Sequence, residues 1–283
     1  MKIKEQGFDG IQIGPIQPLK KDGEVPWFLM YQPVDLKIGN FYCKKEELID
    51  LCRTAKENNI KVIVDVVLNH VAGLENGMLL PHEKVRIRNS DFYKEAVTVE
   101  NWNDRNENIN KCIGLPCLKL ENLELQDMII DFLNSLIKCG VGGFRFDAGK
   151  HIKLPNEGSL FWERVLNSLD EKELFNYAEV IFESTEIIFE YLKYVKVLTE
   201  KRDIESNDIV AFVESHDSYL EFGYTKELSD EDIINKYKEL CDGHKNTLFY
   251  ARPFNNTWES EEIRKINKKE DIKTYHTYRE YVS

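Results

Sequence analysis

Four short apolar segments of this chain each end in acidic, basic or imidazole side chains. They cover residues 62–70, 142–147, 177–180 and 212–217, and each has the composition of a buried strand. In a parallel barrel the carboxyl ends of all strands open on one face, where barrel enzymes keep their chemistry. The pattern therefore predicts a single pocket that gathers carboxylates, imidazoles and a guanidinium.

Short apolar strands alternate with amphipathic helices along most of the chain. Helical stripes are expected at 44–58, 124–138, 159–168, 184–191 and 230–241, and strands near residues 11, 64, 144, 177, 196, 212 and 248. The stretch 61–67 is almost continuously apolar, which is typical of a parallel sheet covered on both faces. This alternation predicts an α/β fold, specifically a TIM (β/α)8-type barrel.

Seven expected strands are one too few for a barrel that closes with eight. Residues 1–6 look like the tail of a helix, so we expect the barrel to lack its first strand. We expect an incomplete catalytic barrel over residues 1–70 and 119–253, and a loop-rich domain at 71–118 inserted after strand 3 of the full barrel. Residues 254–283 are expected to form a charged, helix-leaning C-terminal tail.

The charge and length of the chain limit its partners. A formal net charge of −12 disfavours nucleic acid and anionic membranes as partners. No apolar run approaches the roughly 20 residues of a membrane span, and Met1 leads directly into a charged stretch without a signal peptide. The chain as written is expected to be cytoplasmic, or secreted if a further segment precedes it, and its oligomeric state is left open.

The six cysteines show no zinc-binding spacing. Small buried hydrophobic residues are the favoured interpretation over disulfides. Cys112 and Cys117 are close enough in sequence to bridge across a loop, although nothing in the sequence requires it.

The residue types at the strand ends suit acid–base chemistry on a sugar. Arg145 precedes Asp147 by two residues, so both side chains lie on one strand face, and the guanidinium is expected to keep Asp147 ionised. Asp65 lies inside an apolar strand and is expected to be a structural partner of Arg145. Taken alone, an aspartate after a strand often caps a helix, and a lone histidine is often a buried structural residue. Several carboxylates, imidazoles and a guanidinium in one pocket instead favour cleavage of a glycosidic bond.

The four strand-end segments resemble the conserved regions of the α-amylase family, glycoside hydrolase family 13. The resemblance runs from about residue 7 to 253 and is close to the bacterial calcium-dependent α-amylases. It includes the sequences YQP at 31–33, IGN at 38–40, NWNDR at 101–105, DAGKH at 147–151 and FYARP at 249–253. Four segments in the family's order, with a long insertion after the first, make this resemblance specific.

The resemblance implies roles for individual residues. Asp147 would be the nucleophile, Glu179 the general acid and then base, and Asp217 the carboxylate that stabilises the transition state. Tyr31 would stack on the sugar, and the other expected substrate-binding residues are Gln32, His70, Arg145, Lys150, His151 and His216. The implied activity is retaining hydrolysis of α-1,4-glucosidic bonds in starch-like glucans.

The resemblance also implies a calcium ion that joins the inserted region to the barrel. The matching positions are the Asn69 side chain, the His151 carbonyl and an acid or amide near Asp104. Cys117 stands where relatives carry an aspartate ligand, and a thiol cannot supply the hard oxygen that Ca²⁺ prefers. We therefore expect a possible calcium site that is weakened or lost.

Two kinds of alternative function remain open on the sequence. An oligosaccharide α-glucosidase or a glucan transferase would share the same three carboxylates. A truncated, catalytically inactive family member that at most binds sugar is favoured by the missing first strand.

Overall fold

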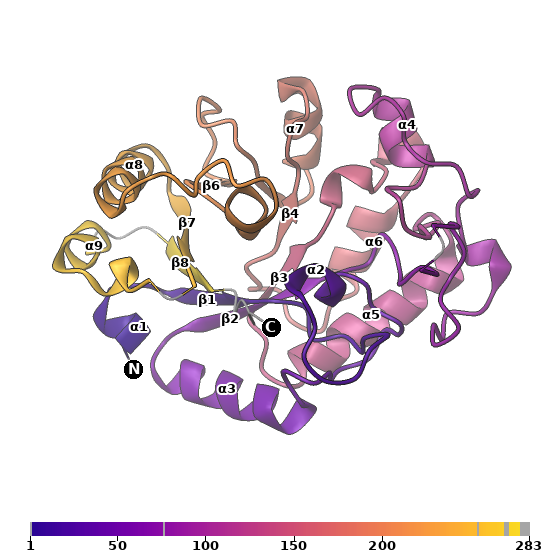
Figure 1. Cartoon of the computed structure of the whole chain (residues 1–283), viewed down its shortest axis with the longest axis horizontal. Coiled ribbons are helices and arrows are strands. Elements are labelled where there is room, and N and C mark those ends of the chain that lie inside the picture. The colour runs from indigo at the N-terminus through magenta and orange to yellow at the C-terminus, as the bar shows by residue number, and fades with distance from the viewer. Residues whose placement is uncertain (1, 76, 254, 269–271, 278–283) are drawn as a thin grey trace.

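The computed structural model describes residues 2–75, 77–253, 255–268 and 272–277. In this part of the chain eight parallel strands form one closed barrel in the order β1 to β8, with β8 beside β1 (Figure 1). The strands are β1 (Gly10–Ile13), β2 (Lys61–Val66), β3 (Gly143–Phe146), β4 (Tyr177–Glu179), β5 (Lys196–Leu198), β6 (Ile209–Phe212), β7 (Asn246–Ala251) and β8 (Ile272–Thr277). The predicted barrel class is confirmed.

Helices surround the barrel, as Figure 1 shows for α3, α5, α8 and α9. The α-helices of the described residues are α1 (Lys2–Glu5), α2 (Trp27–Met30), α3 (Lys45–Glu57), α4 (Arg105–Asn110), α5 (Leu123–Ile137), α6 (Phe161–Asn167), α7 (Thr185–Tyr191), α8 (Asp230–Gly243) and α9 (Glu261–Ile266). Short turns are η1 (Ser90–Phe92), η2 (Gly149–His151), η3 (Pro155–Glu157), the π-helical η4 (Asp217–Glu221) and η5 (Thr257–Glu259).

Helices α5 and α8 begin where a polar cap precedes an apolar stripe. The Asn122 side chain accepts a hydrogen bond from the Leu125 backbone N–H at the start of α5, and Ser229 and Asp232 form a capping box at the start of α8. From there α5 buries Leu125, Ile129 and several further apolar side chains against the sheet. The helices predicted at 124–138 and 230–241 are therefore present as α5 and α8.

The expected gap in the barrel does not exist. β8, which comes from the tail, pairs with β7 from Asn246↔Ile272 to Ala251↔Thr277 and with β1 from Gly10↔Thr274 to Gln12↔His276. The prediction of an incomplete barrel and of a tail outside it was wrong for residues 272–277. The reason is compositional: the strand buries Lys273 and Thr274, and so it lacks the apolar run that marks the other strands.

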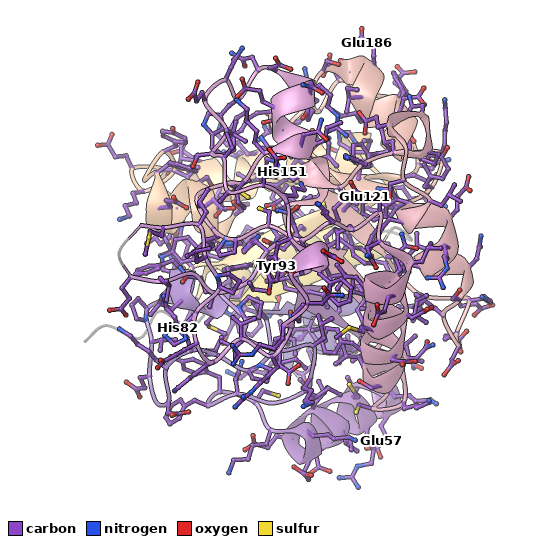
Figure 2. All side chains as sticks on the ribbon, turned by 90° about the vertical axis from the view of Figure 1, so that its right-hand side faces the viewer. Glu57, His82, Tyr93, Glu121, His151 and Glu186 are labelled. Atoms are coloured by element: carbon purple, nitrogen blue, oxygen red, sulfur yellow. The ribbon has the colours of Figure 1, made fainter. Side chains whose placement is uncertain are left out.

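The segment 71–118 contains little regular structure apart from η1 and α4. The isolated antiparallel bridge His70↔Cys117 ties it to the end of the barrel segment, and the bridge Tyr93↔Leu118 joins two parts of the inserted segment itself. Figure 2 looks onto the side of the barrel that this segment covers, where Tyr93, Glu121 and His151 are labelled. Its boundaries as a domain stay a prediction.

Two further sequence expectations concern the thiols and the membrane. All six cysteines are free, and each of them except Cys43 is buried, so no bridge joins Cys112 to Cys117. Among the residues that the structure describes, no helix is both long and apolar enough to cross a bilayer.

Candidate active site

The centre of the site is the buried guanidinium of Arg145 in β3. Its Nη1 donates to both carboxylate oxygens of Asp65, at 2.9 and 2.8 Å, and to Oδ1 of Asp147 at 2.8 Å. Its Nη2 donates to the carboxylate of Glu179. We call these four residues the Arg145 cluster, in which one cation faces three carboxylates.

The register of the barrel explains why these side chains meet. Asp65 on β2 lies directly beside Arg145 on β3, and Arg145 lies beside Tyr177 on β4. Two residues beyond Arg145 and Tyr177 come Asp147 and Glu179, which share their strand faces because side chains alternate with period two. The structure therefore gathers the strand-end groups that the sequence pattern singled out.

Tyr31 connects this cluster to the third predicted carboxylate. Its hydroxyl donates to Oδ2 of Asp65 at 2.8 Å, and its ring stacks on His216 with centroids 5.2 Å apart and planes 8° from parallel. Nε2 of His216 lies 3.3 Å from Oδ1 of Asp217. Because His216 covers one face of the Tyr31 ring, at most the other face is open to a sugar.

Burial dominates the electrostatics of the carboxylates. It raises the pKa of Asp147 well above its usual range, while Arg145 lowers it and Glu179 raises it further. Burial likewise raises the pKa of Asp65 to about 6 and raises the pKa of Asp217. Arg145 lowers the pKa of Asp147 as expected, but burial raises it more strongly, so the net shift is upward.

The histidines of the site are buried and neutral. Burial lowers the pKa of His70 to about 4 and the pKa values of His151 and His216 to about 3. Nε2 of His70 lies 2.8 Å from the Tyr31 carbonyl, and Nδ1 of His151 lies 2.8 Å from the Asn108 carbonyl. These rings are therefore fixed hydrogen-bonding groups at neutral pH.

The remaining predicted substrate-binding residues lie at the edge of this group. Nζ of Lys150 lies 5.7 Å from the centroid of the Trp102 ring, a cation–π contact with the inserted segment. Within the described residues, Oε1 of Gln32 is buried without a hydrogen-bond partner. Among the described residues, the side chains of Gln32 and Lys150 form no hydrogen bond with the Arg145 cluster.

Two arginine pairs near the site were not anticipated. Arg105 binds Glu157 through two hydrogen bonds of 2.7 and 2.8 Å, and it also donates to the Tyr191 hydroxyl. Arg252 binds Glu214 in the same two-point way at 2.9 and 3.0 Å, which gives Glu214 the partner that the sequence did not supply. Arg105 and Arg252 lie within the motifs NWNDR and FYARP, but the distant glutamate partners cannot be found by spacing alone.

Most of the expected calcium-binding groups have other partners, whereas Oδ1 of Asn69 has none among the described residues. Asp104 caps α4 by accepting from the backbone N–H groups of Asn106 and Glu107, at 2.8 and 3.4 Å. The Asn69 amide donates to Sγ of Cys117 at 3.6 Å, and the His151 carbonyl accepts from Nζ of Lys94 at 3.5 Å. Among the residues that the structure describes, no three His, Cys, Asp or Glu side chains gather as metal ligands. The Oδ1 atoms of Asn69 and Asn108 are buried without partners among the described residues, as calcium ligands would be. The Cys117 thiol and the Lys94 ammonium at the His151 carbonyl, however, do not fit Ca²⁺.

The sequence is similar to proteins of known family. The catalytic-domain profile of alpha-amylase matches residues 2–242. An alpha-amylase of Clostridium acetobutylicum is 30% identical over 261 residues, which cover 81% of this chain and 34% of that protein. An alpha-amylase-related protein of Drosophila lini is 32% identical over 164 residues, covering 53% of this chain and 33% of that protein. The chain thus spans about a third of the length of these relatives.

Solved structures share the fold. The alpha-amylase of Geobacillus thermoleovorans complexed with acarbose has a TM-score of 0.70 at 19% identity, over 94% of this chain and 69% of that one. Alpha-amylase I of Eisenia fetida has a TM-score of 0.71 at 20% identity, over 90% of this chain and 66% of that one. From the catalytic-domain match and the shared barrel, we conclude that this chain belongs to the alpha-amylase family of glycoside hydrolases.

Proposed function

We propose that the chain is a retaining glycoside hydrolase that cleaves α-1,4-glucosidic bonds in starch-like glucans. The observation that carries this proposal is that Asp147 and Glu179 are both hydrogen-bonded to the single guanidinium of Arg145. Retaining enzymes need their two carboxyl groups about 5–5.5 Å apart, whereas inverting enzymes leave room for a water molecule between them. Attachment to one guanidinium favours the short separation.

In the first chemical step Asp147 attacks the anomeric carbon of the sugar. The bond from that carbon to the glycosidic oxygen breaks, and Glu179 gives its proton to the departing oxygen. For this step Asp147 must act as the ionised carboxylate and Glu179 as the carboxylic acid. The products of this step are a glycosyl ester on Asp147 and a shortened glucan chain.

In the second step Glu179 acts as a base. It takes a proton from water, the water oxygen attacks the anomeric carbon, and the ester bond to Asp147 breaks. Asp217 and the neutral rings of His70 and His216 would bind the sugar hydroxyls. No step requires a metal ion.

The closed barrel weakens one rival proposal. An inactive relic was favoured by a missing strand, and β8 fills that place. An oligosaccharide α-glucosidase and a glucan transferase would use the same carboxylates. Only the reaction products distinguish these two activities from the proposed hydrolase.

The test is to incubate the purified chain with soluble starch and to follow both reducing sugar and product length. A hydrolase acting inside the glucan releases a range of short chains whose new reducing ends are first in the α form, as seen by proton NMR. Glucose alone would indicate the glucosidase, and products longer than a supplied oligosaccharide would indicate the transferase. No release by the folded chain would refute the proposal.

A further inference from the structure

Lys94 connects the inserted segment to the barrel at the place where the family resemblance implies a calcium ion. Its backbone N–H donates to the Cys117 carbonyl at 2.9 Å, which fixes it within the inserted segment. Its Nζ donates to the His151 carbonyl at 3.5 Å, in the turn that follows β3. Figure 2 labels His151 and also Tyr93, which directly precedes Lys94 in the sequence, on the same side of the molecule.

The end of β2 completes this joint. Asn69 donates through its side-chain amide to Sγ of Cys117, and its backbone carbonyl accepts from the Leu118 N–H at 2.8 Å. The Oδ1 atom of Asn69 is buried and has no hydrogen-bond partner among the described residues. We call Asn69, Lys94, Cys117 and His151 the Lys94 joint.

A calcium ion and the Lys94 ammonium exclude each other at this place. Calcium requires six to eight oxygen ligands, and a thiol is too soft to replace a carboxylate among them. An ammonium already hydrogen-bonded to the His151 carbonyl would also repel a divalent cation in this partly buried setting. The positive charge in the Lys94 joint is that of a lysine side chain of the protein itself.

We propose that the Lys94 ammonium is the resident cation of this joint and holds the inserted segment to the barrel without calcium. Nζ of Lys94 donates to the His151 carbonyl, and Oδ1 of Asn69 in the same joint has no partner among the described residues. The proposal concerns attachment of the inserted segment and does not rest on the hydrolase activity. Its test is therefore a measurement of stability and metal content.

The first measurement uses the wild-type protein. We expect its thermal midpoint to change by less than about 1 °C between excess EDTA and millimolar CaCl₂, because a ligand that binds the folded state raises stability by mass action. We also expect less than one calcium per chain by atomic emission after dialysis against CaCl₂. A large fall in EDTA that CaCl₂ reverses would overturn the proposal.

The second measurement removes the charge. Lys94→Met keeps the aliphatic stem and should lower the thermal midpoint by about 3–8 °C in both EDTA and CaCl₂, because buried acceptors lose their donor. Lys84→Met is the matched control, since Lys84 is an exposed lysine of the same segment, 3.5 Å from an exposed Asp22 carboxylate. Equal effects of the two substitutions would overturn the proposal.

The third measurement restores the carboxylate that relatives carry. With the ammonium still present, Cys117→Asp should remain insensitive to CaCl₂, because the new carboxylate pairs with Lys94. If CaCl₂ stabilises this variant by several degrees, the place is open to a metal and the proposal fails. This variant and the wild type decide the question even if Lys94→Met does not fold.

Discussion

The Arg145 cluster and the Lys94 joint both include residues in or just after β2 and β3, and they treat charge in opposite ways. In the first, one guanidinium faces two buried carboxylates and the partly buried carboxylate of Glu179. In the second, one ammonium faces a carbonyl oxygen, beside an amide and a thiol. Crowded carboxylates suit acid–base chemistry, whereas an ammonium that bonds across a joint suits attachment. The following predictions test this contrast, beginning with the largest expected effect.

Asp147→Asn should lower reducing-sugar release from soluble starch by at least about 10³-fold, because an amide oxygen is a far poorer nucleophile and no ester can form. The thermal midpoint should stay within about 2 °C of wild type, because the change is nearly isosteric and relieves crowding among carboxylates. Undiminished starch hydrolysis by the folded variant would rule out Asp147 as the nucleophile.

Arg145→Met should lower the free energy of unfolding by about 3–5 kcal/mol, because the buried carboxylates of Asp65 and Asp147 and the partly buried one of Glu179 lose their shared cation. Urea titration followed by circular dichroism measures this change. Arg53→Met is a suitable control, since Arg53 pairs with Asp50 on the exposed face of α3 and should contribute less than about 1 kcal/mol. Similar losses in both variants would remove the distinction between a charge-crowded cluster and an ordinary ion pair.

Acid should destabilise the protein through its buried histidines. The pKa of His70 is lowered to about 4 by burial, so between pH 6.5 and about 4 the unfolded chain binds a proton that the folded chain does not. Stability is therefore lost as the pH falls through this window. When the pH falls from 6.5 to 5, the free energy of unfolding of the His70→Asn variant should decrease by about 2 kcal/mol less than that of the wild type.

The carboxylates act in the opposite direction in this range. Burial raises the pKa of Asp65 to about 6. The folded protein therefore binds a proton at Asp65 more tightly than the unfolded chain does. The stability gained from this proton is complete near pH 4 and is lost as the pH rises through 6. This contribution is common to wild type and His70→Asn, and the difference between their denaturation curves isolates the histidine. Parallel pH profiles of the two proteins would contradict the assignment of His70 as a neutral buried ring.

Tyr31→Phe should have the smallest effect, a loss of about 1 kcal/mol in the free energy of unfolding. The substitution removes the hydroxyl that donates to Oδ2 of Asp65, but Arg145 still donates to both oxygens of that carboxylate. Urea titration detects the change. A loss as large as that of Arg145→Met would mean that the cluster depends on Tyr31 and not on its cation.

Local pattern was sufficient to predict most of the barrel and the membership of the Arg145 cluster. The seven strands with apolar runs were located correctly, and period two placed Arg145 and Asp147 on one strand face. These features depend on neighbours in sequence, so composition and spacing report them directly.

Features that depend on distant partners were not predictable in the same way. β8 was missed because its buried Lys273 and Thr274 look solvent-exposed in sequence. Lys94 carried no signal, since only folding brings its Nζ to the carbonyl of His151, 57 residues away. The upward shift in the pKa of Asp147 could not be foreseen, because desolvation depends on the folded surroundings, which a single favourable neighbour does not reveal.

Closure of the barrel by β8 has a consequence for biosynthesis. The strand that seals the sheet lies at residues 272–277, and its partner β1 lies at residues 10–13. During translation both free edges, on β1 and on β7, remain unpaired until this last strand leaves the ribosome, and open edges of this kind recruit other chains. Pairing across so great a sequence separation is also intrinsically slow. The time between synthesis of β7 and arrival of β8 is therefore the period in which the newly made chain most needs protection by chaperones.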